Sequence, residues 1–205
     1  VGLALTGGVA WFTANSPTVT NLIFGNPILF FILIGAELVM VFTLAARINK
    51  FSASTAATLF VIYSLLNGLT MSFIFMAYTR TSVASAFFFT AGTFVVMSFY
   101  GYTTKKSLAS WGSFLFMGLI GIIIASLVNI FLKSPMVYWV VTYAGVLIFV
   151  GLTAYDTQRL KAMAAGGFAG AEMESKAAVM GALALYLDFI NLFLMLLRIF
   201  GGSRD

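Results

Sequence analysis

The stretch 177–200, AAVMGALALYLDFINLFLMLLRIF, decides the fold of this chain. It exceeds the ~20 residues that a helix needs to cross the hydrocarbon core of a membrane. Small and polar residues recur along it at three- and four-residue steps and so share one helical face: Ala177, Gly181, Ala184, Asp188, Asn191 and Met195. The other faces carry Leu, Ile, Phe and Met. Such a helix belongs inside a bundle, and Asp188 is expected to point at protein, about 16 Å beyond Ala177 and near mid-membrane.

The rest of the chain is comparably apolar. Of 205 residues, 61% are hydrophobic and 8% are charged, and the mean hydropathy is +1.06, whereas soluble domains carry about 25% charged residues. The apolar runs are too long for an outer-membrane barrel, whose strands alternate over about 10 residues. We therefore predict an all-α integral membrane protein, a single domain over 1–205 with seven transmembrane helices. The predicted segments are 1–14, 27–46, 54–78, 83–102, 111–132, 136–155 and 177–200.

Several kinds of chemistry are excluded by composition. The chain has no cysteine and no histidine, which removes disulfides, thiol catalysis, histidine bases and Cys/His metal sites. The basic residues sit at the ends of apolar segments rather than in one patch, so the net charge of +5 does not indicate nucleic-acid binding. We expect no enzymatic activity and no bound cofactor. The stretch 1–15 lacks a basic leader and indicates a first span that is cut short, not a signal peptide.

Lysine and arginine predict the topology. Seven lie in alternate connections, namely Arg47, Lys50, Lys105, Lys106, Arg159, Lys161 and Lys176, and only Arg80 and Lys133 lie in the others. The positive-inside rule then places the N-terminus in the cytoplasm. A fully spanning seventh segment would end outside, and a re-entrant segment is the alternative that Arg198 and Arg204 favour. The glycine-containing stretch 162–175 is predicted to be a flexible linker.

Asp156 is the second acid associated with an apolar segment, and it lies just beyond the predicted segment 136–155. It shares a helical face with Thr142, Gly145, Phe149 and Thr153. One interpretation is an interfacial aspartate paired with Arg159 or capping a helix end. For Asp188, the corresponding interpretation is a neutral acid that hydrogen-bonds a neighbouring helix.

If the two carboxyl groups meet, two carboxylates in a dry site cannot both ionise easily. A proton held between them would tie two helices together, and its loss would create repulsion, a cation site, or both. Calcium takes six to eight oxygen ligands, and two aspartates supply at most four. Asn191, backbone carbonyls and water would have to complete the shell, which suits weak or transient calcium binding.

Glu37 is the third buried acid, within the apolar run 30–41. It could line a permeation path. The alternative is a helix–helix hydrogen bond made by its neutral form.

Three stretches give the chain a family resemblance. VGLTAYDTQ at 150–158 and ALYLDFINLF at 184–193 resemble the two signature regions of the transmembrane Bax inhibitor motif family, also called the Bax inhibitor-1 family. YGYTTKK at 100–106 is similar to its bacterial, YetJ-like branch. The resemblance covers essentially the whole chain.

This resemblance implies seven helices with the last at the centre, in a bacterial inner membrane. It implies a pH-sensitive calcium leak controlled by a di-aspartyl pair, which by motif is Asp156 and Asp188. A basic residue at the cytoplasmic end of the second helix can latch onto that pair in the closed state, and Arg47 is the candidate, with Lys50 as its competitor. Glu37 resembles an acid in the second helix of some relatives.

Two other functions remain open from the sequence. An intramembrane aspartyl protease also places one aspartate after a tyrosine on its sixth helix and another on its seventh, as Tyr155-Asp156 and Asp188 do. Its Gly-x-Gly and Pro-Ala-Leu motifs are absent here. The other function is a membrane-embedded regulator that binds a partner such as a membrane protease, with 162–175 as the contact.

Overall fold

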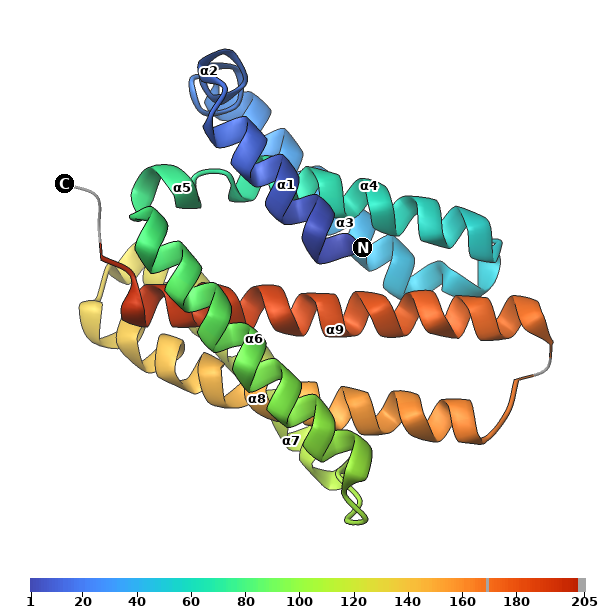
Figure 1. Ribbon diagram of the computed structural model, residues 1–205. Coiled ribbons are helices and arrows are strands. Elements are labelled where there is room, and N and C mark those ends of the chain that lie inside the picture. Colours follow the sequence, from blue (N-terminus) through green and yellow to red (C-terminus); the bar gives the residue numbers. More distant parts are fainter. Residues whose placement is uncertain (169, 203–205) are drawn as a thin grey trace. The chain divides into compact units, whose positions relative to one another are not determined.

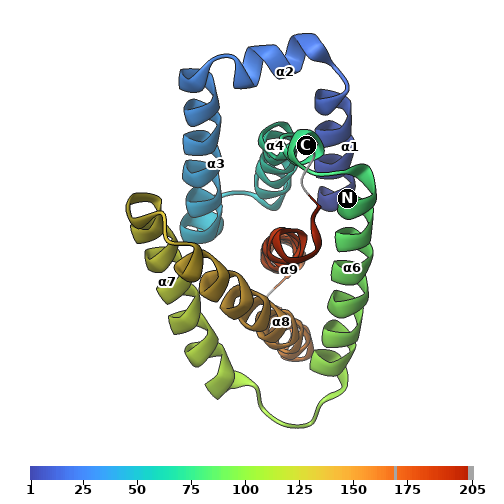
Figure 2. The same ribbon diagram turned by 90° about the vertical axis from the view of Figure 1, so that its left-hand side faces the viewer.

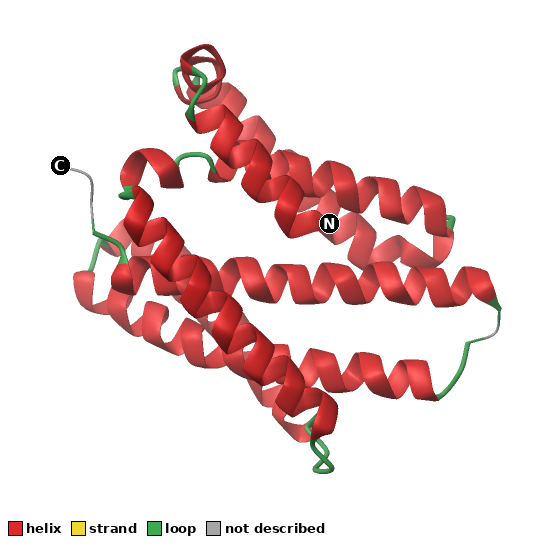
Figure 3. Cartoon of the chain, in the orientation of Figure 1, coloured by secondary structure: helices red, strands yellow, loops and turns green. Residues whose placement is uncertain are grey.

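The computed structural model describes residues 1–168 and 170–202. These residues form α-helices joined by short connections, with no β-strand element in the described ranges (Figures 1 and 3). The helices are α1 (Gly2–Ala14), α2 (Pro17–Phe24), α3 (Pro27–Arg47), α4 (Ala53–Met71), α5 (Ile74–Ala77), α6 (Arg80–Thr103), α7 (Ala109–Leu132), α8 (Pro135–Ala165) and α9 (Ala171–Phe200), with a short 3-10 helix, η1, at Ile48–Lys50. The all-α prediction is confirmed.

Six helices of the described chain are long and apolar enough to cross a membrane, so the predicted count of seven is not confirmed. They are α3 with η1, α4 with α5, α6, α7, α8 and α9. The predicted first segment forms α1, whose 13 residues span only about 20 Å at 1.5 Å per residue. That length falls short of the ~30 Å hydrocarbon core, which is why α1 is not among the six candidate spans.

Prolines and polar caps set where the membrane helices begin. Pro27 and Pro135 occupy the first turns of α3 and α8, where a missing N–H costs nothing. Asn26 accepts hydrogen bonds from the N–H groups of Ile28 and Leu29, at 3.1 and 3.3 Å. These caps satisfy backbone donors that would otherwise lie unpaired at the start of the helix.

The prediction of a flexible linker at 162–175 is wrong, because most of this stretch is helical. α8 continues to Ala165 and α9 begins at Ala171, so only 166–170 connect them. Hydropathy marks the part of a helix in lipid, whereas Ala, Glu, Lys and Met extend a helix into water. Gly167 and Gly170 have φ of +73° and +103°, a left-handed conformation that glycine adopts without strain.

The chain forms two compact units. The first comprises Val1–Arg80, Phe168–Leu183 and the chain from Gly202. Within it α1 packs closely on α4, and a Cβ at Gly68 would lie 2.8 Å from the carbonyl oxygen of Thr6. The Thr6 hydroxyl donates to the Ser64 carbonyl at 2.8 Å. Figure 2 shows α2 running across between the ends of α1 and α3.

The second unit comprises Thr81–Gly167 and Ala184–Gly201. α7 and α8 lie side by side in it (Figures 1 and 2). Its apolar core draws on both of these helices and on the C-terminal part of α9: Leu115, Ile122, Val141, Phe149, Leu152, Leu192, Met195 and Leu196. The unit therefore holds the stretches that carry both predicted aspartates.

α9 is the most buried of the candidate spans. In its most apolar window 56% of residues are buried, against 6% for α3 and for α7. This fits the small and polar stripe of 177–200. The single-domain organisation and the central position of the last helix stay predictions, and Arg204 lies outside the described residues.

Candidate functional site

Asp188 lies on a tightly packed turn of α9. Its side chain is 4% exposed, and the neighbouring Phe189 is also buried. The Phe189 ring contacts Phe87 and Phe94 of α6 edge-on, with centroids 5.7 and 5.4 Å away. These two ring contacts fix the rotation of α9 at the turn that carries Asp188.

Asp156 lies on α8 and its carboxyl group meets that of Asp188. The two side chains are within hydrogen-bonding reach of each other. Asp156 is half-buried, and Asp188 Oδ2 is buried without a hydrogen-bond partner in the described chain. The structure thus brings together the two acids that the sequence stripes paired.

Two glycines allow α6 and α7 to approach α8 beside Asp156. A Cβ at Gly101 of α6 would collide with the carbonyl group of Ala154, and one at Gly112 of α7 would collide with the ring of Tyr155. No larger residue fits at either position without displacing its neighbour on α8. Residues 154 and 155, which immediately precede Asp156, are therefore held closely by both helices.

Gln158 ties the same end of α8 to the α6–α7 connection, and Lys161 ties it to the last turn of α6. Gln158 Oε1 accepts from the Leu108 N–H, and its Nε2 donates to the Lys106 carbonyl, both at 2.8 Å. Lys161 Nζ donates to the Tyr102 carbonyl at 2.7 Å and lies 4.8 Å from the Tyr102 ring centroid. These positioning residues were not predicted from the sequence, in which the amide two positions beyond Asp156 was the available signal.

The threonine hydroxyls near Asp156 bond to backbone carbonyls of their own helix rather than to the Asp156–Asp188 pair. Thr153 and Thr157 each donate to a carbonyl one turn back in α8, at 2.8 and 2.7 Å. Arg159 acts on Asp156 electrostatically, but within the described ranges no ion pair closer than 4 Å joins them. The predicted Arg159 pairing is therefore a longer-range attraction, and the nearer partner of Asp156 is Asp188.

The pair by itself offers few ligands for a cation. No group of three or more His, Cys, Asp or Glu side chains able to hold a metal gathers in the described part of the chain. Asn191 is half-buried, and its amide donates to the Leu187 carbonyl at 2.8 Å. A calcium ion at the pair would need backbone carbonyls and water to complete its six to eight oxygens.

Glu37 and Arg47 lie in the first unit. Glu37 Oε1 accepts a 2.8 Å hydrogen bond from the Thr70 hydroxyl, which joins α3 to α4. This is the helix–helix bond that the sequence left as an alternative. Tyr63 and Asn67 lie two turns and one turn before Thr70 and join the same polar cluster, with Asn67 Nδ2 donating to Tyr63 Oη at 3.4 Å. Arg47 is exposed at the end of α3.

Comparisons with known proteins identify the family of the chain. A sequence model described as "Inhibitor of apoptosis-promoting Bax1" matches residues 1–205. The inner membrane protein YbhL of Escherichia coli K12 is 54% identical over 211 residues, covering 100% of this chain and 88% of YbhL.

Proteins of two other bacteria are also similar to this chain. One from Borreliella burgdorferi is 45% identical, covering 100% of this chain and 88% of its own length. One from Deinococcus radiodurans is 44% identical, covering 100% of this chain and 86% of its own length. With six candidate spans and a family match over its whole length, the chain is a multi-pass membrane protein that belongs to the Bax inhibitor family.

Proposed function

We propose that this protein is a pH-sensitive calcium-leak channel whose opening is controlled by the Asp156–Asp188 pair. The observation that carries the proposal is the contact between two carboxyl groups from different helices, one of them 4% exposed. Ionisable groups at such depth are costly and usually serve a pathway or a partner. Here each acid has the other as its partner.

The proposed switch is the proton that the two carboxyl groups share. With one proton present, a carboxyl donates to a carboxylate, and this hydrogen bond links α8 to α9. Without it, two like charges face each other where the low dielectric makes repulsion strong. Loss of the proton therefore both separates the helices and creates negative charge that attracts a cation. On this mechanism the calcium leak rises as the pH rises.

Calcium is proposed as cargo rather than as a resident ion. Two aspartates supply at most four oxygens, which supports brief coordination along a path rather than tight binding. Asn191, on the same face of α9 as Asp188, and Glu37 on α3 are proposed as further polar groups along the calcium path. Arg47 is proposed as the basic latch of the closed state. The proposed setting is a bacterial cytoplasmic membrane with the N-terminus inside.

The proposal is tested by calcium flux into proteoliposomes over a series of pH values. The variants are Asp156→Asn and Asp188→Asn, which keep the side-chain shape and remove the titration. Ser126→Ala on α7 is the matched control, because the Ser126 hydroxyl donates to its own helix, at 2.7 Å. We expect a pH-dependent leak in the parent and the control, and a leak without pH response in both aspartate variants. Unchanged flux and pH response in both variants would contradict the proposal.

An intramembrane aspartyl protease is the second candidate, because two carboxyls sharing a proton are also the machinery of that class. We propose that the chain is not an enzyme, since the motifs that accompany such a pair in those proteases are missing. Cleavage of a model transmembrane peptide by the parent, absent in Asp188→Asn, would instead assign the pair to catalysis.

A further inference from the structure

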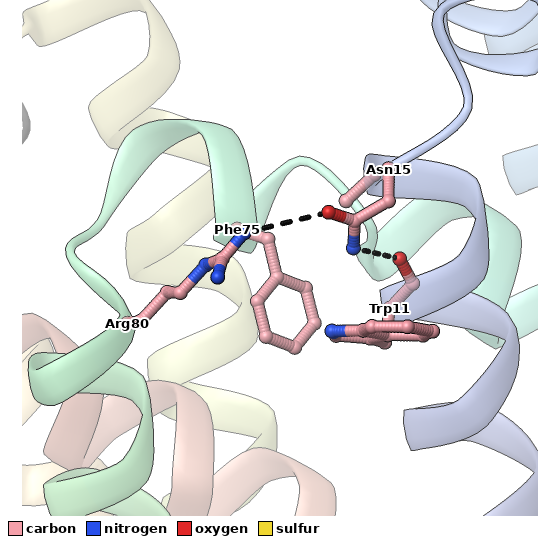
Figure 4. Close-up of a pocket in the computed structure, with 5 residues that line it drawn as sticks. Trp11, Asn15, Phe75 and Arg80 are labelled. Carbon is pink, nitrogen blue, oxygen red and sulfur yellow. Dashed lines mark hydrogen bonds between the residues drawn. The ribbon is translucent and has the colours of Figure 1, made fainter.

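A cavity of about 230 Å³ lies in the first unit, and none of its lining residues is assigned to the leak. It is lined by Trp11, Ala14, Asn15, Phe75 and Arg80. Figure 4 shows the guanidinium of Arg80 and the amide of Asn15 pointing toward each other, with the rings of Phe75 and Trp11 beside them. The volume lies below the ~300 Å³ at which pockets for drug-sized ligands begin, so the cavity suits a small group rather than a whole metabolite.

The positive charge of Arg80 favours an anionic ligand in this cavity. In the described ranges no carboxylate lies within 4 Å of Arg80. The Arg80 guanidinium makes a long hydrogen bond, 3.4 Å, to Asn15 Oδ1. Asn15 is itself oriented by donating its Nδ2 to the Trp11 carbonyl at 2.7 Å. Arginine has five N–H donors in a planar fork that matches phosphate oxygens, and the bond to Asn15 uses one of them.

The position of the cavity at the ends of apolar helices indicates the source of that anion. α1 ends at Ala14 and the candidate span α6 begins at Arg80, so the lining residues stand at the ends of apolar helices. The Trp11 side chain is 57% exposed, and exposed indoles are typical of the headgroup region of a bilayer. The aromatic walls of Trp11 and Phe75 suit the apolar backbone that carries a lipid phosphate.

We propose that this cavity binds the phosphate of an anionic phospholipid headgroup, held by Arg80 and Asn15 against Trp11 and Phe75. A free phosphate ion shares the anionic chemistry but has no apolar part for the aromatic walls. A net anionic lipid is preferred over a zwitterionic one because no carboxylate of the described residues pairs with Arg80.

Tryptophan fluorescence in nanodiscs tests the proposal on the full chain. Trp111→Phe and Trp139→Phe leave Trp11 as the only tryptophan of the three. Nanodiscs of phosphatidylcholine then receive a small, equal share of brominated phosphatidylglycerol or brominated phosphatidylcholine, whose bromines quench a nearby indole. We expect the binding constant from quenching to favour phosphatidylglycerol about fivefold, the scale of one basic side chain at an anionic surface.

Matched variants separate this site from general surface charge. Arg80→Gln is expected to abolish the preference, and Arg80→Lys, which keeps the charge without the planar fork, to give an intermediate value. Lys133→Gln removes an exposed cation at the end of α7 and is expected to leave the preference intact. Equal quenching by both lipids in the parent, or equal loss in Arg80→Gln and Lys133→Gln, would overturn the proposal. Inorganic phosphate that abolishes the preference would assign the cavity to the free ion and overturn the lipid as its occupant.

Discussion

The carboxyl group of Asp156 on α8 lies within hydrogen-bonding reach of that of Asp188 on α9. Each residue belongs to one of the two signature stretches, although 32 positions separate them in the sequence. The contact therefore depends on how α8 and α9 pack, and its energy is measurable apart from any transport.

The first prediction concerns the coupling between these two acids. Because they contact each other, the effects of Asp156→Asn and Asp188→Asn on the free energy of unfolding should not add. We expect an interaction energy of about 0.5–3 kcal/mol, the range for residues in contact. Chemical unfolding in detergent of both single variants and the double variant measures it. Asp156→Asn combined with Ser126→Ala is the control and should be additive; an additive aspartate cycle would show that the carboxyls do not interact.

The second prediction concerns the glycines beside the pair. Gly112→Ala places a methyl group against the Tyr155 ring, and we expect a loss of about 1–3 kcal/mol of stability, as for other overpacked sites. Gly121→Ala on the same helix has nothing within 4 Å of its new Cβ and should be neutral or slightly stabilising. Thermal unfolding of the two variants compares them directly. Equal effects would mean that the α7–α8 approach at Tyr155 is not tight.

The third prediction concerns the tie made by Gln158. Gln158→Leu removes the acceptor of the Leu108 N–H and the donor to the Lys106 carbonyl, at a cost of about 1–3 kcal/mol for the groups left unpaired. Gln158→Glu keeps the acceptor and should lose less. Hydrogen exchange at residues 106–109 reports the change, with faster exchange expected in Gln158→Leu. Exchange as slow as in the parent would contradict the role of Gln158 in holding the connection.

The fourth prediction separates the two interpretations of Glu37. Glu37→Gln keeps an oxygen that accepts from Thr70, so stability should change little. Thr70→Val leaves Glu37 without that donor and should cost about 1–3 kcal/mol. If Glu37 also lies on the calcium path, Glu37→Gln lowers the leak while its pH response persists. A stable Glu37→Gln variant with unchanged flux would leave Glu37 as a structural residue only.

The sequence predicts much of this architecture because lipid imposes a simple rule. Spans near 27–46, 111–132 and 136–155 follow from apolar length alone, and they correspond to α3, α7 and α8. The same rule does not reveal how far a helix continues into water, so the part of α8 beyond position 155 was missed. The apolar stretch 1–14 forms a helix of 13 residues, and the predicted count of seven spans stays a prediction.

Some features of the candidate site could also be predicted from the sequence, and others could not. The pairing of Asp156 with Asp188 was implied by the family resemblance, and their polar helical faces were consistent with it, but the distance between the two acids did not follow from the sequence. The contribution of Gln158 was not expected, because it depends on where the connection 104–108 turns back, which no periodicity encodes. For Glu37 the sequence offered two interpretations, and only the position of Thr70 in space identifies its hydrogen-bond donor.

The central claim is that a proton shared by Asp156 and Asp188 sets the calcium leak. The most direct test is the ratio of calcium flux in alkaline to flux in acidic buffer, measured for the parent and for Asp188→Asn in matched proteoliposomes. We expect a ratio well above one in the parent and close to one in the variant, since the amide that replaces the carboxyl group has no proton to lose in this pH range. The same ratio in both proteins would contradict it.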